Sequence, residues 1–260
     1  MKKHSKIVDF NNLLARQEYL VVQSNDLVKS FGNLKAFEHK VLDFCVSYVQ
    51  KESKATETFE TTTSDILKHF SLNASGQNYM RVAKAFKKLN ENTALYFAKQ
   101  RKDGKKSIIM GQLFQKIELV EDGRIEFQFS DLAAPYIFEL QQNFYTLKLR
   151  ELSMIKSKYT MIMLKLIEAK RFGDRNTINI EGTVEEFKEW FLGKEKAKNW
   201  TTARFTQQVL NVALKEIETK IPLITSELNT MKYNRKVIGY QILVTCLLYT
   251  SPSPRDRTRS

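Results

Sequence analysis

The residues best suited to chemistry lie on one face of the segment 203–218, whose sequence is ARFTQQVLNVALKEIE. Apolar side chains recur there every four residues, and this spacing predicts one buried stripe along a helix. The stripe comprises Phe205, Val209, Ala213 and Ile217. The other face carries hydroxyl, guanidinium and amide groups, from Thr202, Arg204, Gln207, Gln208 and Asn211. Arginine can bond guanine O6 and N7 together, and Gln or Asn can bond adenine N6 and N7, so this face is predicted to read base edges in a DNA groove.

Cationic and polar side chains elsewhere are predicted to contact phosphates, because such groups bind the DNA backbone without reading its sequence. They are Lys215 on the same helix, and Asn78, Arg81, Lys84 and Lys88 on a helix predicted over 78–92. Ala85 is expected on that outer face, opposite Tyr79, Val82, Phe86 and Leu89. Two predicted hairpins have basic tips, made of Arg101, Lys102, Lys105 and Lys106 and of Lys232, Arg235 and Lys236. A merely solvated charged surface is the alternative for each group.

Catalytic motifs are missing from the sequence. His4, His39 and His69 are scattered, so they form no His-x-His pair of the kind that nicking enzymes use to hold a metal. The sequence also lacks the G-x-x-x-x-G-K-[ST] phosphate loop, the G-x-S-x-G elbow and the H-E-x-x-H zinc motif. We therefore expect no enzymatic activity, no metal and no cofactor.

The charge balance indicates the class of partner. Lys and Arg number 42 against 29 Asp and Glu, for a net charge of +13 and a pI near 9.5, which favours a polyanion such as nucleic acid. Cys45 and Cys246 are too few for a disulfide framework or a four-cysteine zinc site. The longest apolar run, at 237–249, is too short to span a bilayer, and no secretory signal is visible. We expect a cytoplasmic protein without a membrane partner.

The predicted helix and hairpin belong to a unit whose order occurs twice, about 120 residues apart. The order is helices, a short strand, a capped helix, a loop, a polar-faced helix and a basic-tipped hairpin, which is the order of a winged helix. We predict an α+β fold of two tandem winged-helix domains. The helix that opens the second half is expected to bury one stripe, made of Tyr159, Ile162, Met163, Leu166 and Ile167.

The predicted domains cover 22–140 and 141–244, after an N-terminal arm at 1–21. Residues 245–260 differ sharply in composition and contain two of the four prolines. We expect this tail to be disordered, since it cannot contribute to a core. It resembles a translated cloning adapter joined to a truncated reading frame.

Three stretches resemble the iteron-binding, theta-type family of plasmid replication initiators, the Rep proteins. They are VVQSNDLVKSFGNLKAFEHKVLDFCVSYV, FYTLKLRELSMIKSKYTMIMLKLIEAKR and FTQQVLNVALKEIE. The resemblance covers roughly 22–244 and implies two winged-helix domains. It implies that the second domain dominates binding to the origin repeats, or iterons, while the first mediates dimerisation and adds accessory DNA contacts.

The same resemblance implies the partners. Monomers would bind iterons, open adjacent A·T-rich DNA and recruit the host replication initiator and the replicative helicase or its loader. Dimers would bind an operator inverted repeat and repress the initiator's own gene. The alternatives are a transcriptional regulator of the same fold, a rolling-circle nicking initiator with a covalent tyrosyl–DNA link, and an interaction protein whose polar helix faces bind an acidic partner.

Overall fold

The computed structural model describes residues 31–49, 53–54, 56–134, 136–137, 154–170, 176–221 and 223–246. The predicted N-terminal arm, the predicted domain boundary at 140–141 and the tail beyond Cys246 lie outside these residues.

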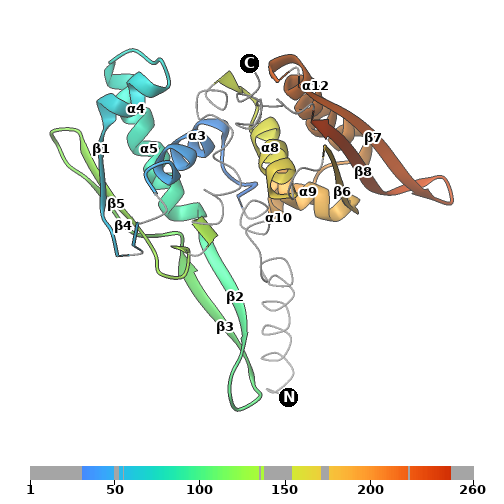
Figure 1. Ribbon diagram of the computed structural model, residues 1–260, viewed down its shortest axis with the longest axis horizontal. Helices are drawn as coiled ribbons and strands as arrows, with labels where there is room; N and C mark the ends of the chain where they lie inside the picture. Colours follow the sequence, from blue (N-terminus) through green and yellow to red (C-terminus); the bar gives the residue numbers. More distant parts are fainter. Residues whose placement is uncertain are drawn as a thin grey trace, which may run out of the picture.

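The first half of the chain folds around its own hydrophobic core. Ser75 caps the long helix of this half by accepting a hydrogen bond from the Asn78 backbone N–H at 3.3 Å. Strands β1, β5 and β4 form an antiparallel sheet in that order, whereas β2 and β3 form a separate hairpin (Figure 1). The elements are α3 (Ala36–Val46), β1 (Phe59–Thr62), α4 (Thr63–His69), α5 (Gly76–Asn92), β2 (Ala94–Gln100), β3 (Lys106–Gln112), β4 (Phe114–Leu119) and β5 (Arg124–Phe129).

The second half repeats this arrangement. Its sheet has the order β6-β8-β7, so in both halves the short strand before the capped helix pairs with the last strand. Thr183 and Glu186 form the predicted capping box at the start of α9. The elements are α8 (Lys158–Lys170), β6 (Thr177–Thr183), α9 (Val184–Leu192), α10 (Lys194–Ala197), α11 (Thr202–Phe205), the π-helical turn η1 (Thr206–Leu210), α12 (Asn211–Lys220), β7 (Ile224–Tyr233) and β8 (Lys236–Cys246).

The shared topology confirms the predicted α+β fold of two tandem winged helices. One boundary changes: Thr245 and Cys246, predicted to lie in the tail, belong to strand β8. They pair with Thr225 and Ile224 of β7, so the ladder continues past residue 244.

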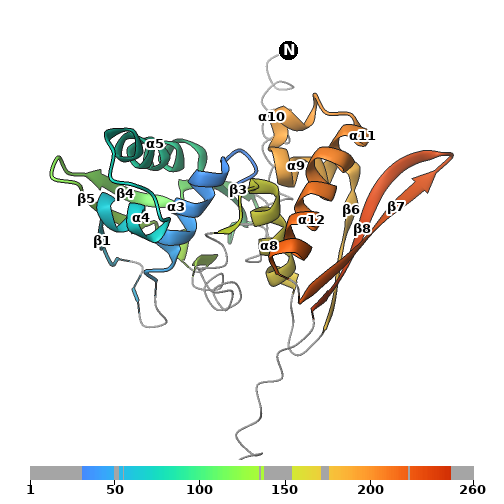
Figure 2. The same cartoon turned by 90° about the horizontal axis from the view of Figure 1, so that it is seen from above.

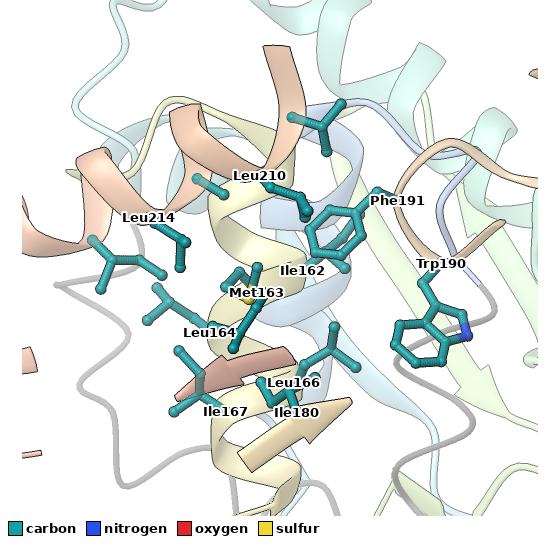
Figure 3. Packing of buried hydrophobic residues seen from close by; sticks show 14 of the residues in the cluster. Ile162, Met163, Leu164, Leu166, Ile167, Ile180, Trp190, Phe191, Leu210 and Leu214 are labelled. Atoms are coloured by element: carbon teal, nitrogen blue, oxygen red, sulfur yellow. The ribbon is translucent and has the colours of Figure 1, made fainter. Parts of the chain in front are cut away.

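Helix α8 is buried on more sides than one predicted stripe requires. Every residue from Thr160 to Ile167 is at most 7% exposed. Figure 3 shows part of this packing, in which side chains of α8 lie beside Phe191 of α9, Leu210 of η1 and Leu214 of α12. The opposite side of α8 faces α3 of the first domain, and the two helices lie side by side in Figures 1 and 2. The single-stripe expectation was wrong because α8 contacts both domains.

A buried ion pair joins the domains at this contact. The Lys165 ammonium of α8 donates to the Asp43 carboxylate of α3 at 2.5 Å, and the two side chains are 8% and 6% exposed. Lys158 at the start of α8 donates to the Gly32 carbonyl at 2.6 Å. A Cβ at Gly32 would lie 2.6 Å from the Trp190 carbonyl oxygen, so the chain entering α3 packs directly on the end of α9.

Replacing Asp43 with Ala should lower the free energy of unfolding by about 3–5 kcal/mol, because it leaves the Lys165 charge buried without its carboxylate partner. The double variant Asp43→Leu/Lys165→Met should lose much less, since it removes both charges and fills the space. Urea unfolding followed by circular dichroism measures both. A double variant less stable than Asp43→Ala would contradict this account.

The buried imidazole of His39, at the same contact, should make the stability of the protein depend on pH. Burial, and then the charges of Lys165 and Lys158, hold the pKa of its imidazole well below 6.5. The unfolded chain therefore binds a proton that the folded chain rejects, and stability present above about pH 6.5 is lost as the pH falls toward the folded pKa. Burial raises the pKa of Asp43, which acts with the opposite sign as the pH falls through that raised pKa. Urea unfolding between about pH 7.5 and 5.5 should show a decline that His39→Leu flattens.

Candidate nucleic-acid interface

The long helix formed by α11, η1 and α12 carries the predicted base-reading face. Thr201 caps its start by accepting a hydrogen bond from the Arg204 backbone N–H at 3.3 Å. The predicted inner stripe is confirmed, because Phe205, Val209, Ala213 and Ile217 are all 0% exposed. This burial fixes which side of the helix remains available to a ligand.

A π-helical turn interrupts the helix at Thr206–Leu210, where the Asn211 N–H bonds to the Thr206 carbonyl five residues earlier. In a regular α-helix, each four-residue step advances about 40° beyond one turn, so four apolar residues at that spacing would spiral by about 120°. The π turn contains one extra residue, which removes about 100° of this rotation. Ala213 and Ile217 therefore lie within about 20° of Phe205 around the helix axis. The strict four-residue repeat was the sequence signal for this turn, and we did not predict it.

Most of the predicted readers lie on the outer face. Arg204, Gln207, Gln208, Asn211 and Lys215 are exposed. The Arg204 guanidinium stacks over the Trp200 ring at 4.1 Å, and its Nε donates to Gln208 Oε1 at 3.0 Å, so these two side chains are held in one arrangement. The terminal nitrogens of Arg204 keep the fork that pairs with guanine. Thr202 is half-buried, so it lies at the edge of this face.

Val212 also belongs to the outer face, although sequence analysis did not include it. Its side chain is 43% exposed on α12, in the helix turn between Gln208 and Lys215. An exposed aliphatic group beside amides suits contact with the methyl group of thymine.

The two carboxylates near the end of this helix bind protein groups. Glu216 accepts hydrogen bonds from the backbone N–H groups of Lys156 and Ser157, at 2.8 and 3.1 Å, and from Thr160 Oγ1 at 2.6 Å. Glu218 accepts from the backbone N–H and hydroxyl of Ser226 on β7 through one oxygen. Both carboxylates are therefore held by protein donors at the end of the helix, and the residues predicted to read bases are all neutral or cationic.

The tip of the second hairpin is as predicted. Lys232, Arg235 and Lys236 are exposed at the end of β7 and β8. Asn234 and Arg235 have φ values of 47° and 66°, which gives a two-residue turn of the type that tight hairpins favour. Tyr233 beside them is 68% exposed. These side chains gather on one projecting loop, where phosphate contacts are geometrically possible.

The outer face of α5 differs in part from the prediction. Arg81, Lys84 and Lys88 are exposed, but Ala85 is 2% exposed and Tyr79 is 39% exposed. The prediction for these two was wrong because Ala85 completes the helical stripe formed with Val82, Phe86 and Leu89, which leaves Tyr79 at its edge.

Several polar groups of this face already have protein partners. Asn78 is half-buried, and its amide donates to the Asn73 carbonyl at 3.0 Å. Lys88 pairs with Glu91 at 2.6 Å. The Arg81 guanidinium lies 4.1 Å from the centre of the Phe37 ring. Among the four side chains of α5 that were predicted to contact phosphates, Asn78 is the one bonded to the loop that precedes the helix.

The basic tip of the first domain lies on a hairpin that is not equivalent to the wing of the second. Arg101, Lys102, Lys105 and Lys106 are exposed at the end of the separate β2–β3 hairpin, around Asp103. The sheet hairpin equivalent to β7–β8 is β4–β5, whose turn contains Glu121 and Asp122. The two predicted basic tips therefore occupy different positions in the two domains.

No group of three or more His, Cys, Asp or Glu in the described part of the chain could hold a metal ion. His39 is buried, and the His69 ring packs on Phe44 and Phe70 at 5.2 and 4.9 Å. Within the same described residues, no helix is long and apolar enough to cross a membrane.

The repeated sheet topology, with a polar-faced helix beside each sheet, defines a tandem winged-helix protein. Comparison with family models is more specific. The model for "Initiator Replication protein, WH1" matches residues 20–168, and the model for "Initiator Rep protein, WH2" matches residues 183–244. The chain belongs to this family of replication initiators. The first match includes most of α8, although α8 packs into the second core.

Solved structures with the same fold include the Pi initiator protein and RctB. The chain is similar to the Pi initiator protein in complex with iteron DNA, with 15% identity, a TM-score of 0.62, and coverage of 85% of this chain and 94% of that chain. It is also similar to domains 2 and 3 of RctB, with 11% identity, a TM-score of 0.52, and coverage of 83% and 84%. Comparison with curated protein sequences gives no match.

Replacing Glu216 with Gln should cost about 1–3 kcal/mol of stability, because an amide has one acceptor oxygen for groups that now bond to both carboxylate oxygens. Glu218→Gln is the matched control, since Ser226 uses a single oxygen that an amide retains. Urea unfolding compares the two variants. Equal losses would mean that Glu216 acts only through its charge.

Proposed function

We propose that this protein initiates plasmid replication by binding direct repeats in the plasmid origin as a sequence-specific duplex-DNA-binding protein. The observation that carries the proposal is the outer face of the α11–η1–α12 helix. It presents Arg204, Gln207, Gln208 and Asn211 together, with both nearby carboxylates bonded to protein groups. Membership of the initiator family and the fold shared with an initiator bound to iteron DNA support the same function.

In this proposal the helix enters the major groove and the two basic hairpin tips, β2–β3 and β7–β8, contact the backbone. Base readout belongs to Arg204, Gln207, Gln208 and Asn211, and Thr202 contributes from the edge. Phosphate anchoring belongs to Lys215, to the exposed cations of α5 and to the two basic hairpin tips. If about six cations neutralise phosphates, affinity falls about a thousandfold between 50 and 200 mM salt.

Initiation in this proposal involves no covalent chemistry by this chain. Binding to the repeats opens neighbouring A·T-rich DNA, and the host initiator and the replicative helicase or its loader then assemble there. Dimers of the chain bind an inverted repeat and repress its gene. The protein acts in the cytoplasm, where the plasmid lies.

Fluorescence anisotropy on two labelled duplexes tests the proposal. One carries the repeats upstream of the gene, and the other carries the same bases shuffled. We expect Arg204→Ala to lose about 5- to 150-fold in preference for the repeats, the range for one bidentate base contact. Lys84→Ala should weaken binding to both duplexes alike, because a phosphate contact carries no sequence information.

Each alternative has its own signature in this experiment. Equal, weak binding of wild-type protein to both duplexes would refute sequence-specific initiation and favour an acidic protein partner. Nicked strands in the presence of magnesium would indicate a nicking initiator. Repeat binding without melting of adjacent A·T-rich DNA, detected by permanganate, would indicate a regulator.

A further inference from the structure

We propose that Tyr240, in wing strand β8, is a positioning residue for base readout. Through Thr206 it holds the π-helical turn of the long helix, and with it the direction in which Gln207, Gln208 and Asn211 project. The inference rests on the proposed function, because it concerns how the same face meets DNA.

Tyr240 is fully buried although it carries a hydroxyl group. Its ring packs against Phe187 at 5.4 Å and against Phe205 of the long helix at 6.0 Å. Its hydroxyl lies 2.7 Å from Thr206 Oγ1. The aromatic ring therefore belongs to the core, while the hydroxyl group reaches the helix at Thr206, the first residue of its π-helical turn.

Both hydroxyl groups bond at the first turn of the helix. Thr206 donates its only hydroxyl proton to the Thr202 carbonyl at 2.9 Å. The Tyr240 hydroxyl lies 2.7 Å from Thr206 Oγ1, where either oxygen can donate, and it also donates to the Thr202 carbonyl at 3.4 Å, while burial raises the pKa of the Tyr240 phenol. The chain of bonds runs from the wing strand to Thr206 and on to the first turn of the helix.

Thr206 bonds at both ends of its residue to hold the π-helical turn. Its carbonyl accepts the five-residue bond from the Asn211 N–H, and its side chain bonds back to the carbonyl four residues earlier. If the turn reverted to a regular α-helix, the residues after it would rotate by about 100° relative to Arg204. Asn211, which now lies about 120° around the helix axis from Arg204, would then lie about 20° from it, and Ala213 and Ile217 would leave the side of Phe205, so a different set of side chains would face the groove.

The wing and the reading helix are thereby linked through one hydroxyl group. The wing strand that carries Tyr240 also carries Lys236 at its tip, so backbone contacts and base contacts are fixed relative to each other. Removing the hydroxyl should reduce discrimination between sequences more than it reduces overall affinity.

Tyr240→Phe tests this inference, because it deletes the hydroxyl and keeps the ring in the core. We expect the preference for repeats over the shuffled duplex to fall about three- to tenfold, the effect of one hydrogen bond, with non-specific affinity unchanged. Thr206→Val should give the same loss, Thr206→Ser should retain the preference, and the double variant Tyr240→Phe/Thr206→Val should lose no more than either single one.

Tyr48→Phe is the matched control. The Tyr48 hydroxyl donates to Thr61 Oγ1 at 3.0 Å in the first domain, so this variant deletes the same kind of bond away from the long helix. It should keep the repeat preference. If wild-type protein prefers the repeats and both Tyr240→Phe and Thr206→Val keep that preference within twofold, the positioning role is overturned while the proposed function stands. If wild-type protein shows no preference, the proposed function itself fails.

Discussion

Helix α8 packs against both domains at once, and the arrangement of the two domains depends on this double contact. A helix with apolar residues on all sides is stable only where every side is covered. The second core covers one side through α9 and α12, and α3 of the first domain covers the other. Lys165 lies within this contact, where the Asp43 carboxylate compensates its charge. Both the position of the domains and the second core therefore depend on one helix.

The same helix connects the domain contact to the reading face. Glu216 of α12 holds the backbone where the chain enters α8, while Asp43 holds the middle of α8 from the first domain. A displacement of α3 against α8 would therefore be transmitted to the C-terminal end of α12 through packed side chains and charge-assisted hydrogen bonds. This continuity gives the two winged helices a physical route by which one can influence the other.

Electrostatics and helix geometry act together at the proposed interface. A helix that approaches a phosphate backbone should present no free carboxylate, and here both acidic side chains near its end bond to protein donors. The π turn keeps the buried stripe on one side of the helix before and after it, because it offsets the drift of a four-residue repeat, and so it sets the direction of the outer side chains relative to the core. The charge of the outer face thus allows approach to DNA, and the π turn determines which outer side chains face the groove.

Local patterns in the sequence determined the helices, strands and caps, the buried stripe of the reading helix, and the exposed position of Arg204, Gln207, Gln208 and Asn211. These features follow from periodicity and capping, which act over a few residues. Tertiary structure alone decided that α8 is buried on both sides and that the basic β2–β3 hairpin is not the equivalent of the second wing, whereas the burial of Ala85 follows from the spacing of its own helix. It also decided the partners of Asp43, Glu216 and Tyr240. These depend on contacts between residues far apart in the chain, because burial and hydrogen-bond satisfaction are properties of the packed whole.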